Sequence, residues 1–261
     1  MTATPPVLEL RRVSVMRGSR LVLRELDLTV HEGGHVAILG PNGCGKSTLV
    51  KTLTRECYPL VEPGMSLRVF GRETWELSEL RSLIGLVSND LATTYTRRVT
   101  GLDAVISGYL GSIGIWPHHE VTPAMRDGAR AVLERLEVAH LADRPLHELS
   151  SGEQRRILIG RALVHGPRAL LFDEPSNSLD LRAQRDLRQV LRKLAREGVT
   201  LLVVTHHLDD VVPEIGRVVF MRDGRVVDDG PKERLLTAEK LDELFGVAGE
   251  VVVRDGWYHR W

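Results

Sequence analysis

The sequence has little cysteine, and its two cysteines, Cys44 and Cys57, are too few for a disulfide framework. The chain opens with Met-Thr-Ala-Thr-Pro-Pro, which has neither the basic start nor the apolar stretch of a secretion signal. No stretch approaches the roughly 20 apolar residues that a membrane helix requires, and apolar runs such as residues 201–204 have the length of a strand. We therefore expect a protein of the reducing cytoplasm that reaches a membrane only through a partner chain.

Net charge is also absent, because 35 basic residues balance 35 acidic ones among the 261 residues of the chain. A neutral protein has no overall attraction to nucleic acid or anionic lipid, although one face can still be basic. One expected helix, at residues 181–197, has such a face. Its charged residues are Arg182, Arg185, Arg188, Arg192, Lys193 and Arg196 against Asp186 and Glu197.

The apolar pattern predicts an α/β fold with two kinds of sheet. In the first thirty residues, apolar and polar side chains alternate, which is typical of a half-buried antiparallel element. The run at residues 35–39 is followed by a Gly-rich turn and an expected helix at 47–53, and the runs at 169–172 and 199–204 predict strands buried on both faces.

The remaining segments predict an insertion and an extension. Residues 100–163 have helical rather than strand patterns, so we expect a helical subdomain at about residues 95–163, inserted in a domain that spans residues 1–245. Asp255 and Gly256 lie between apolar runs, which predicts a β-hairpin extension at residues 246–261.

The Gly-rich turn fits the phosphate-loop pattern G-x-x-x-x-G-K-[ST], and it lies between an expected strand and an expected helix, as that motif requires. Its residues are Gly40, Pro41, Asn42, Gly43, Cys44, Gly45, Lys46, Ser47 and Thr48. Backbone amides of such a loop point at phosphate oxygens and the helix N-terminus favours an anion. We expect Lys46 to reach the β- and γ-phosphates and Ser47 to bind Mg²⁺.

Two adjacent carboxylates follow the expected strand at residues 169–172. Asp173 would hold Mg²⁺ and Glu174 would orient or deprotonate an attacking water. Together with the phosphate loop, this pair predicts an Mg²⁺-dependent nucleotide hydrolase with a P-loop NTPase core.

Three further motifs resemble those of the ATP-binding cassette (ABC) ATPases. Residues 149–156, Leu-Ser-Ser-Gly-Glu-Gln-Arg-Arg, resemble the family signature, residues 178–180 resemble the loop after the catalytic Glu, and Thr205-His206 resembles the switch histidine. The resemblance covers about residues 7–245. Ser150 and Glu153 also fit a helix-capping box, which would leave backbone amides facing an anion.

For this family, the resemblance implies a head-to-tail dimer that holds ATP between the phosphate loop of one subunit and the signature of the other. Ser150 and Gly152 would contact the γ-phosphate across that interface, and Asp180 would help to couple the two sites. His206 would sense the γ-phosphate and position Glu174 and water.

Four positions depart from the family pattern. Ser151 stands where the family usually has Gly, and Glu153 where it usually has Gln. Asn89 stands at the family's Gln position, where its shorter amide would contact Mg²⁺ or water. Arg17 stands where an aromatic side chain usually stacks on adenine, a role that a guanidinium plane can also take, although a solvated Arg17 is an equal alternative.

We expect the ATP-binding subunit of a transporter at the inner face of the plasma membrane, bound there by a separate transmembrane permease. A single cassette without a membrane helix resembles importer subunits. The sequence of residues 205–215 is similar to that of cassettes for molybdenum or iron-complex uptake, which favours a metal-containing or small solute.

Part of that group is linked to photorepair, so a soluble ATPase that acts on nucleic acid, or a nucleotide-gated regulator, is the alternative. The basic helix at residues 181–197 is its main support, although a solvated amphipathic helix explains those charges better.

Overall fold

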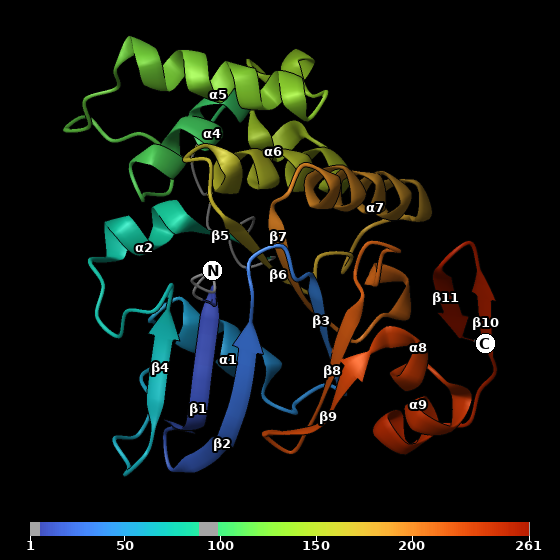
Figure 1. The fold of residues 1–261 in the computed structure, drawn as a ribbon. Coiled ribbons are helices and arrows are strands. Elements are labelled where there is room, and N and C mark those ends of the chain that lie inside the picture. The colour runs from blue at the N-terminus through green and yellow to red at the C-terminus, as the bar shows by residue number, and fades with distance from the viewer. Residues whose placement is uncertain (1–5, 89–98, 261) are drawn as a thin grey trace, which may run out of the picture.

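A six-stranded sheet with strand order β5-β6-β7-β3-β8-β9 runs through the middle of the molecule (Figure 1). The computed structural model describes residues 6–88 and 99–260. The neighbouring strands are parallel except β9, which is antiparallel to β8. The strands are β3 (Val36–Leu39), β5 (Ile84–Ser88), β6 (Ala169–Asp173), β7 (Thr200–Thr205), β8 (Arg217–Arg222) and β9 (Arg225–Pro231).

A smaller antiparallel sheet of order β2-β1-β4 lies beside it and confirms the prediction for the N-terminal region. Its strands are β1 (Leu8–Arg17), β2 (Arg20–Val30) and β4 (Ser66–Val69). Along β2, the apolar side chains at 26, 28 and 30 are buried and the carboxylates at 25 and 27 are exposed. The inward side chains pack with those of α1 (Lys46–Leu53) into one apolar cluster.

Helices occupy most of residues 99–168, which precede β6, as the sequence predicts for the inserted region. They are α4 (Gly101–Tyr109), α5 (Pro123–Arg135) and α6 (Ser151–Leu163), with the short turns η1 (Ala139–Leu141) and η2 (Leu146–Glu148). In Figure 1 these helices lie together at the top of the molecule, and α7 (Leu181–Arg196) lies alongside α6. The small helix α2 (Leu77–Leu83) precedes β5.

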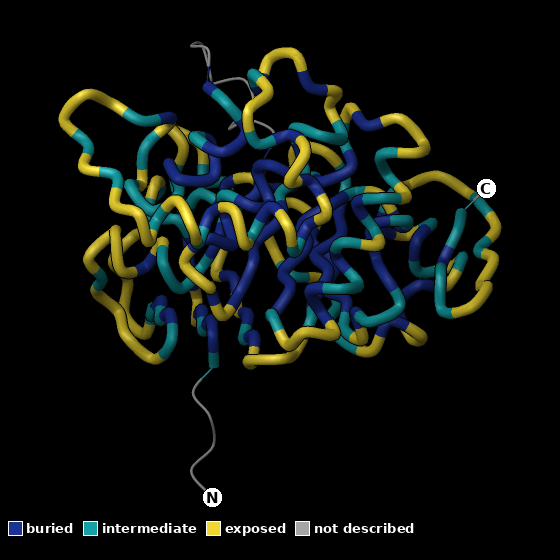
Figure 2. Tube along the Cα trace, turned by 90° about the horizontal axis from the view of Figure 1, so that it is seen from above, coloured by how far each residue is buried: buried dark blue, intermediate teal, exposed yellow. Residues whose placement is uncertain are grey.

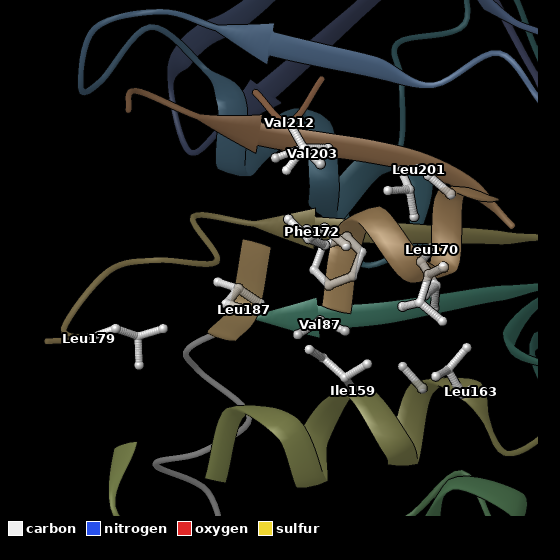
Figure 3. Packing of buried hydrophobic residues seen from close by; sticks show 14 of the residues in the cluster. Val87, Ile159, Leu163, Leu170, Phe172, Leu179, Leu187, Leu201, Val203 and Val212 are labelled. Carbon is white, nitrogen blue, oxygen red and sulfur yellow. The ribbon is translucent and has the colours of Figure 1, made fainter. Parts of the chain in front are cut away.

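The central strands are buried on both faces, because helices including α4, α6 and α7 cover one face of the sheet and α1 with the antiparallel sheet covers the other. Leu170 and Phe172 of β6 are 0% exposed. Phe172 lies between Val87 of β5 and Val203 of β7, and Ile159 of α6 packs on the same side (Figure 3). Such strands are read as continuous apolar runs rather than alternating ones, which is the pattern that predicts them in the sequence. Figure 2 shows the same burial along the middle of the molecule.

The C-terminal segment returns to the main body. Helices α8 (Lys232–Leu235) and α9 (Ala238–Phe245) follow β9, and the hairpin of β10 (Val251–Arg254) and β11 (Trp257–Arg260) comes last. Strand β11 contacts the turn η3 (Leu208–Asp210), which follows β7. Figure 1 shows this hairpin at the side of the molecule, next to α8 and α9.

Within residues 6–88 and 99–260, no helix combines the length and apolar character needed to cross a membrane.

Candidate functional site

The phosphate loop connects the end of β3 to the start of α1, the position that its sequence predicts. Two glycines are required by its geometry. A Cβ on Gly40 would lie 2.2 Å from the carbonyl oxygen of Met221 in β8, and Gly45 adopts a φ of 109°. A side chain at either position would collide or strain the backbone, so these two residues fix the path of the loop.

The first turn of α1 is arranged to bind an anion. Gly45 is its N-cap and no side chain of the described residues caps it, so its first amides and their partial positive charge stay available for phosphate. Lys46 is 5% exposed, and its Nζ donates to the carbonyl oxygens of Gly40 at 2.7 Å and Pro41 at 3.2 Å. The ammonium therefore spans the mouth of the loop.

Glu174 lies directly across from that ammonium. Its Oε1 is 3.3 Å from Lys46 Nζ, and its Oε2 is 2.7 Å from His206 Nδ1. Glu174 has a φ of 48°, an uncommon backbone conformation for a residue other than glycine, and such strain concentrates at functional sites. The structure thus brings together the three residues that the sequence predicts to be catalytic.

The order of the strands in the sheet explains why residues that are distant in sequence lie close together at this site. Strands β6, β7 and β3 are parallel neighbours whose carboxyl ends share one edge, where Asp173 aligns with Val204 and Leu39 aligns with Thr205. The backbone N–H of Glu174 donates to the carbonyl of Val204 at 2.8 Å. Ligands of open α/β sheets bind at this carboxyl edge.

Oxygen donors suited to Mg²⁺ are present at this edge. Ser47 offers an exposed hydroxyl in the first turn of α1, and Asp173 offers a half-buried carboxylate at the end of β6. Mg²⁺ prefers a few carboxylate or hydroxyl oxygens together with phosphate oxygens and water, so this donor set fits it. Asn89, the third predicted ligand, lies outside the described residues.

A second group of possible ligand atoms belongs to Glu174, His206 and His207, which lie within 4.8 Å of one another. The sequence favours a surface or packing role for His207, because the spacing of the two histidines matches no metal motif. In the structure, His207 Nε2 lies 3.0 Å from Asn177 Oδ1, and its ring is 3.9 Å from that of His206.

The signature forms a capping box at the start of α6, as predicted. Glu153 N–H donates to Ser150 Oγ at 3.3 Å, and Glu153 Oε2 accepts from Ser150 N at 2.8 Å. Hydrogen bonds from the Ser150 backbone and hydroxyl lower the pKa of Glu153. The carboxylate that replaces the family's Gln is therefore engaged in the cap rather than directed at a bound anion.

Beside this cap is a hollow of about 330 Å³, lined by residues that include Ser150, Gly152, Asp180 and Arg182. Its lining is separate from that of the phosphate loop, so the two predicted ATP-binding surfaces of one chain do not form a single pocket. A Cβ on Gly152 would lie 2.6 Å from Ala183 Cβ, which explains the glycine. Asp180 caps α7 by accepting from Ala183 N at 2.7 Å.

Arg17, the predicted adenine contact, ends β1 and donates to Cys57 Sγ at 3.7 Å, with an exposed side chain. The structure places it on the antiparallel sheet but does not test base stacking.

Cys44 is buried inside the phosphate loop, and burial raises the pKa of its thiol. The neutral thiol that this favours is poorly suited to redox chemistry, because thiolates are the reactive form.

Most charges of the basic helix are paired within the chain. Arg188 pairs with Asp209, Lys193 with Glu137, and both Arg192 and Arg196 with Glu214. A phosphate-binding stripe needs free cations, so the helix that is the main support for the nucleic-acid alternative offers few of them.

Sequence reasoning missed a buried polar group next to the catalytic residues. Asp210 is 0% exposed, and it accepts hydrogen bonds from Ser176 and Thr205. Arg155 of α6 is 5% exposed nearby. The sequence gives no signal for Asp210, which directly follows Asp209, whereas Arg155 stands inside the signature motif.

Comparison with known proteins agrees with these motifs. Residues 23–177 match the ABC transporter family. The phosphonates import ATP-binding protein PhnC 2 of Synechococcus sp. (strain JA-2-3B'a(2-13)) is 33% identical over 237 residues, covering 87% of this chain and 85% of that protein. The hemin import ATP-binding protein HmuV of Bradyrhizobium diazoefficiens is 31% identical over 267 residues, covering 96% and 92%.

Among solved structures, the dimeric bacterial ABC transporter cassette MJ0796 superposes with a TM-score of 0.70 and 27% identity, covering 86% of this chain and 98% of that one. Fold and motif order therefore agree with the sequence comparison.

Proposed function

Since the chain belongs to the ABC transporter family and is an ATP-hydrolysing ATPase of that family, we propose that it is the ATP-binding subunit of an importer and drives a separate membrane permease. The observation that carries the proposal is the position of Glu174, which touches both Lys46 and His206. A group that contacts the phosphate-binding ammonium and a polarising imidazole is placed to act on a water next to the γ-phosphate.

In this proposal, nucleotide binding rearranges the contacts of Lys46. A triphosphate in the loop would draw its ammonium away from Glu174 Oε1, because phosphate oxygens carry more charge. Glu174 would then hold the attacking water, while His206 keeps the carboxylate oriented through Oε2. Ser47 and Asp173 would hold Mg²⁺, which would supply charge stabilisation for the phosphoryl group.

A head-to-tail pair of cassettes supplies the missing half of each site. The signature hollow of one chain is separate from its own phosphate loop, so a second copy must present its signature to that phosphate loop. The related cassette MJ0796 has a dimeric structure. We propose that this chain forms the same kind of homodimer, or pairs with another cassette.

The membrane partner is proposed to bind a groove of about 230 Å³ between α2, α4 and α6. Its lining combines apolar side chains such as Leu77, Leu80 and Ile113 with Arg81 and Arg161. An amphipathic helix docks in such a groove through a few apolar anchors. Leu77 and Ile113 are 44% and 39% exposed, so both are available to an incoming helix.

The transported solute is a metal-containing or other small compound in this proposal. The relatives named above import chemically different solutes, phosphonates and hemin, so likeness to them defines the role and leaves the solute open. The nucleic-acid alternative has no comparable support, because four of the six cations on α7 are paired internally.

A co-purification experiment tests the importer proposal. The chain is produced together with the membrane protein encoded beside it, and detergent-solubilised membranes are passed over a column that captures the cassette. We expect a permease with several apolar spans to be retained and to be lost with Leu77→Arg in the groove, whereas Val252→Arg on the far hairpin keeps it. Salt-sensitive retention of DNA without any membrane protein would contradict the proposal.

A further inference from the structure

Three side chains with metal-binding atoms meet at the catalytic edge. Glu174, His206 and His207 form what we call the Glu-His-His cluster, in which each side chain offers one ligand atom within 4.8 Å of the others. It is the one group of this kind among residues 6–88 and 99–260. The spacing of two adjacent histidines indicates no metal site by itself, but the carboxylate reaches them from the end of a neighbouring strand. Two histidines and one glutamate are a ligand set of catalytic zinc sites.

The donor atoms of the cluster favour a transition metal over Mg²⁺. Imidazole nitrogens suit Zn²⁺, Ni²⁺ and Cu²⁺, whereas Mg²⁺ prefers oxygen ligands such as those of Ser47 and Asp173. Bonds of about 2.0–2.1 Å to a tetrahedral Zn²⁺ place its ligands about 3.3 Å apart. His206 Nδ1 and Glu174 Oε2 are 2.7 Å apart, so side-chain shifts of about 1 Å within the cluster would meet that geometry.

Neighbouring contacts hold the cluster in place. His207 Nε2 lies 3.0 Å from Asn177 Oδ1, which can only accept, so this nitrogen carries the hydrogen and leaves Nδ1 for a metal. Histidines that bind metals usually have such an outer partner, which fixes the orientation of the ring. The backbone N–H of His207 donates to Thr205 Oγ1 at 3.0 Å, and that of His206 donates to Glu174 Oε2 at 3.3 Å. The segments that carry the three ligands are therefore tied together.

The surroundings of the cluster leave room for a second cation. The side chains of His206 and Glu174 are 26% and 15% exposed, so an ion from solvent can reach them. Lys46 Nζ lies 3.3 Å from the other oxygen of Glu174, Oε1, and it also donates to two carbonyl oxygens of the phosphate loop. The ammonium and a metal ion would therefore bind different oxygens of one carboxylate.

We propose that the Glu-His-His cluster is an inhibitory site for a divalent transition-metal ion of the zinc class. The inhibition rests on the catalytic role of Glu174 given under the proposed function. The metal takes the place of the hydrogen between His206 Nδ1 and Glu174 Oε2, and a neutral His206 ring keeps its one hydrogen, which moves to Nε2 through solvent. The metal then holds the lone pair that would accept a proton from the attacking water. Hydrolysis stops, while the phosphate loop still binds nucleotide.

Binding is measured on the purified full chain without nucleotide. Calorimetric titration with Zn²⁺ should show one ion per chain, and Co²⁺ in its place should give the visible absorption of a four-coordinate ion. His207→Ala removes one ligand and should weaken Zn²⁺ binding at least about tenfold, since loss of an outer partner alone costs about 10- to 100-fold.

Two variants are matched controls for this titration. His119→Ala alters another pair of adjacent histidines, whose rings are 4.4 Å apart but which belong to no such ligand group in the described chain. Cys57→Ser removes the partly exposed thiol, a second type of zinc ligand. We expect both to bind Zn²⁺ as the parent does.

Inhibition is measured at saturating Mg²⁺ and ATP, with free Zn²⁺ fixed by a metal buffer because ATP itself binds zinc. Zinc should lower kcat of the parent and of His119→Ala at least about tenfold, since it occupies the general base, and a zinc chelator should restore it. His207→Ala should hydrolyse ATP at the parent rate without zinc and require at least about tenfold more free Zn²⁺ for inhibition. Additional Mg²⁺ should not relieve the inhibition, because it uses other ligands.

Several results would overturn the proposal. Equal zinc affinity in His207→Ala and the parent, or loss of binding in Cys57→Ser, would place the ion elsewhere. Relief by Mg²⁺ would place it at the magnesium ligands, and an unchanged or raised kcat with zinc bound would contradict inhibition. An inactive parent protein would instead contradict the ATPase assignment, while the titration without nucleotide would still decide whether the cluster binds metal.

Discussion

Glu174 Oε2 lies 2.7 Å from His206 Nδ1 in a chain where 31 residues separate the two in sequence. The parallel neighbours β6 and β7 create this contact by ending at the same edge. The other oxygen of Glu174 is held by Lys46. One carboxylate thus joins the phosphate-binding and the polarising halves of the site, and the first two predictions test this carboxylate and its imidazole partner.

Glu174→Gln should reduce ATP hydrolysis by at least about 100-fold, because the amide cannot accept a proton from water. ATP still binds, so dimers stabilised by ATP should accumulate in size-exclusion chromatography with light scattering. Glu25→Gln, on an exposed carboxylate of the antiparallel sheet, is the control. Hydrolysis by Glu174→Gln at the parent rate would show that another group is the base.

His206→Ala should lower kcat by about 10- to 100-fold with little change in ATP affinity, since the imidazole orients Glu174 and does not hold the phosphate loop. Steady-state kinetics and nucleotide binding measure the two effects separately. His207→Ala is a matched control next in sequence, because His207 contacts Asn177 and not Glu174 in the described hydrogen bonds. Equal losses in both variants would contradict a specific role for His206.

Gly152→Ala should destabilise the chain by about 1–3 kcal/mol, because its Cβ would lie 2.6 Å from Ala183 Cβ. Helices α6 and α7 would have to move apart and would distort the signature hollow, so ATP hydrolysis should fall as well. Chemical denaturation and ATPase assays measure both effects. Ala183→Gly in the same protein removes the collision, so failure of this second change to restore stability would refute the explanation.

The stabilising effect of Glu153 should depend on pH. Its pKa is lowered in the folded chain by hydrogen bonds from Ser150, so the ionised form stabilises the fold above the ordinary pKa of about 4.5. This contribution is lost as the pH falls through the lower, folded pKa. Thermal unfolding of Glu153→Gln should therefore differ most from the parent near neutral pH, and a difference that grows towards pH 3 would contradict the cap.

The sequence predicts the phosphate loop and the Asp173-Glu174 pair because each has a short local pattern with its own chemistry, whereas the prediction for His206 depends on the resemblance to the ABC family. The strands of the central sheet are equally readable, since continuous apolar runs such as residues 169–172 belong to strands buried on both faces. The structure confirms the signature cap for the same reason, because a capping box involves residues only three apart.

Contacts between distant segments have no such local signature. Asp210 looks like one of two ordinary acidic residues in a turn, and only the folded chain shows that Thr205 and Ser176 donate hydrogen bonds to it. The ion pairs of the basic stripe on α7 are hidden in the same way, because the counter-charge Glu214 comes from another segment. Single-sequence reasoning sees the charges but not their partners.

The C-terminal hairpin carries a tryptophan that can serve as a fluorescence reporter of the catalytic edge. Its strand β11 contacts the turn after His206, and His259 Nδ1 lies 2.7 Å from Asp209 Oδ1. Trp257 of the same strand lies 5.7 Å from the Arg192 guanidinium. Tryptophan emission depends on its surroundings, so the fluorescence of this indole should change when nucleotide moves the turn, and the hairpin can report on hydrolysis in real time without an added dye.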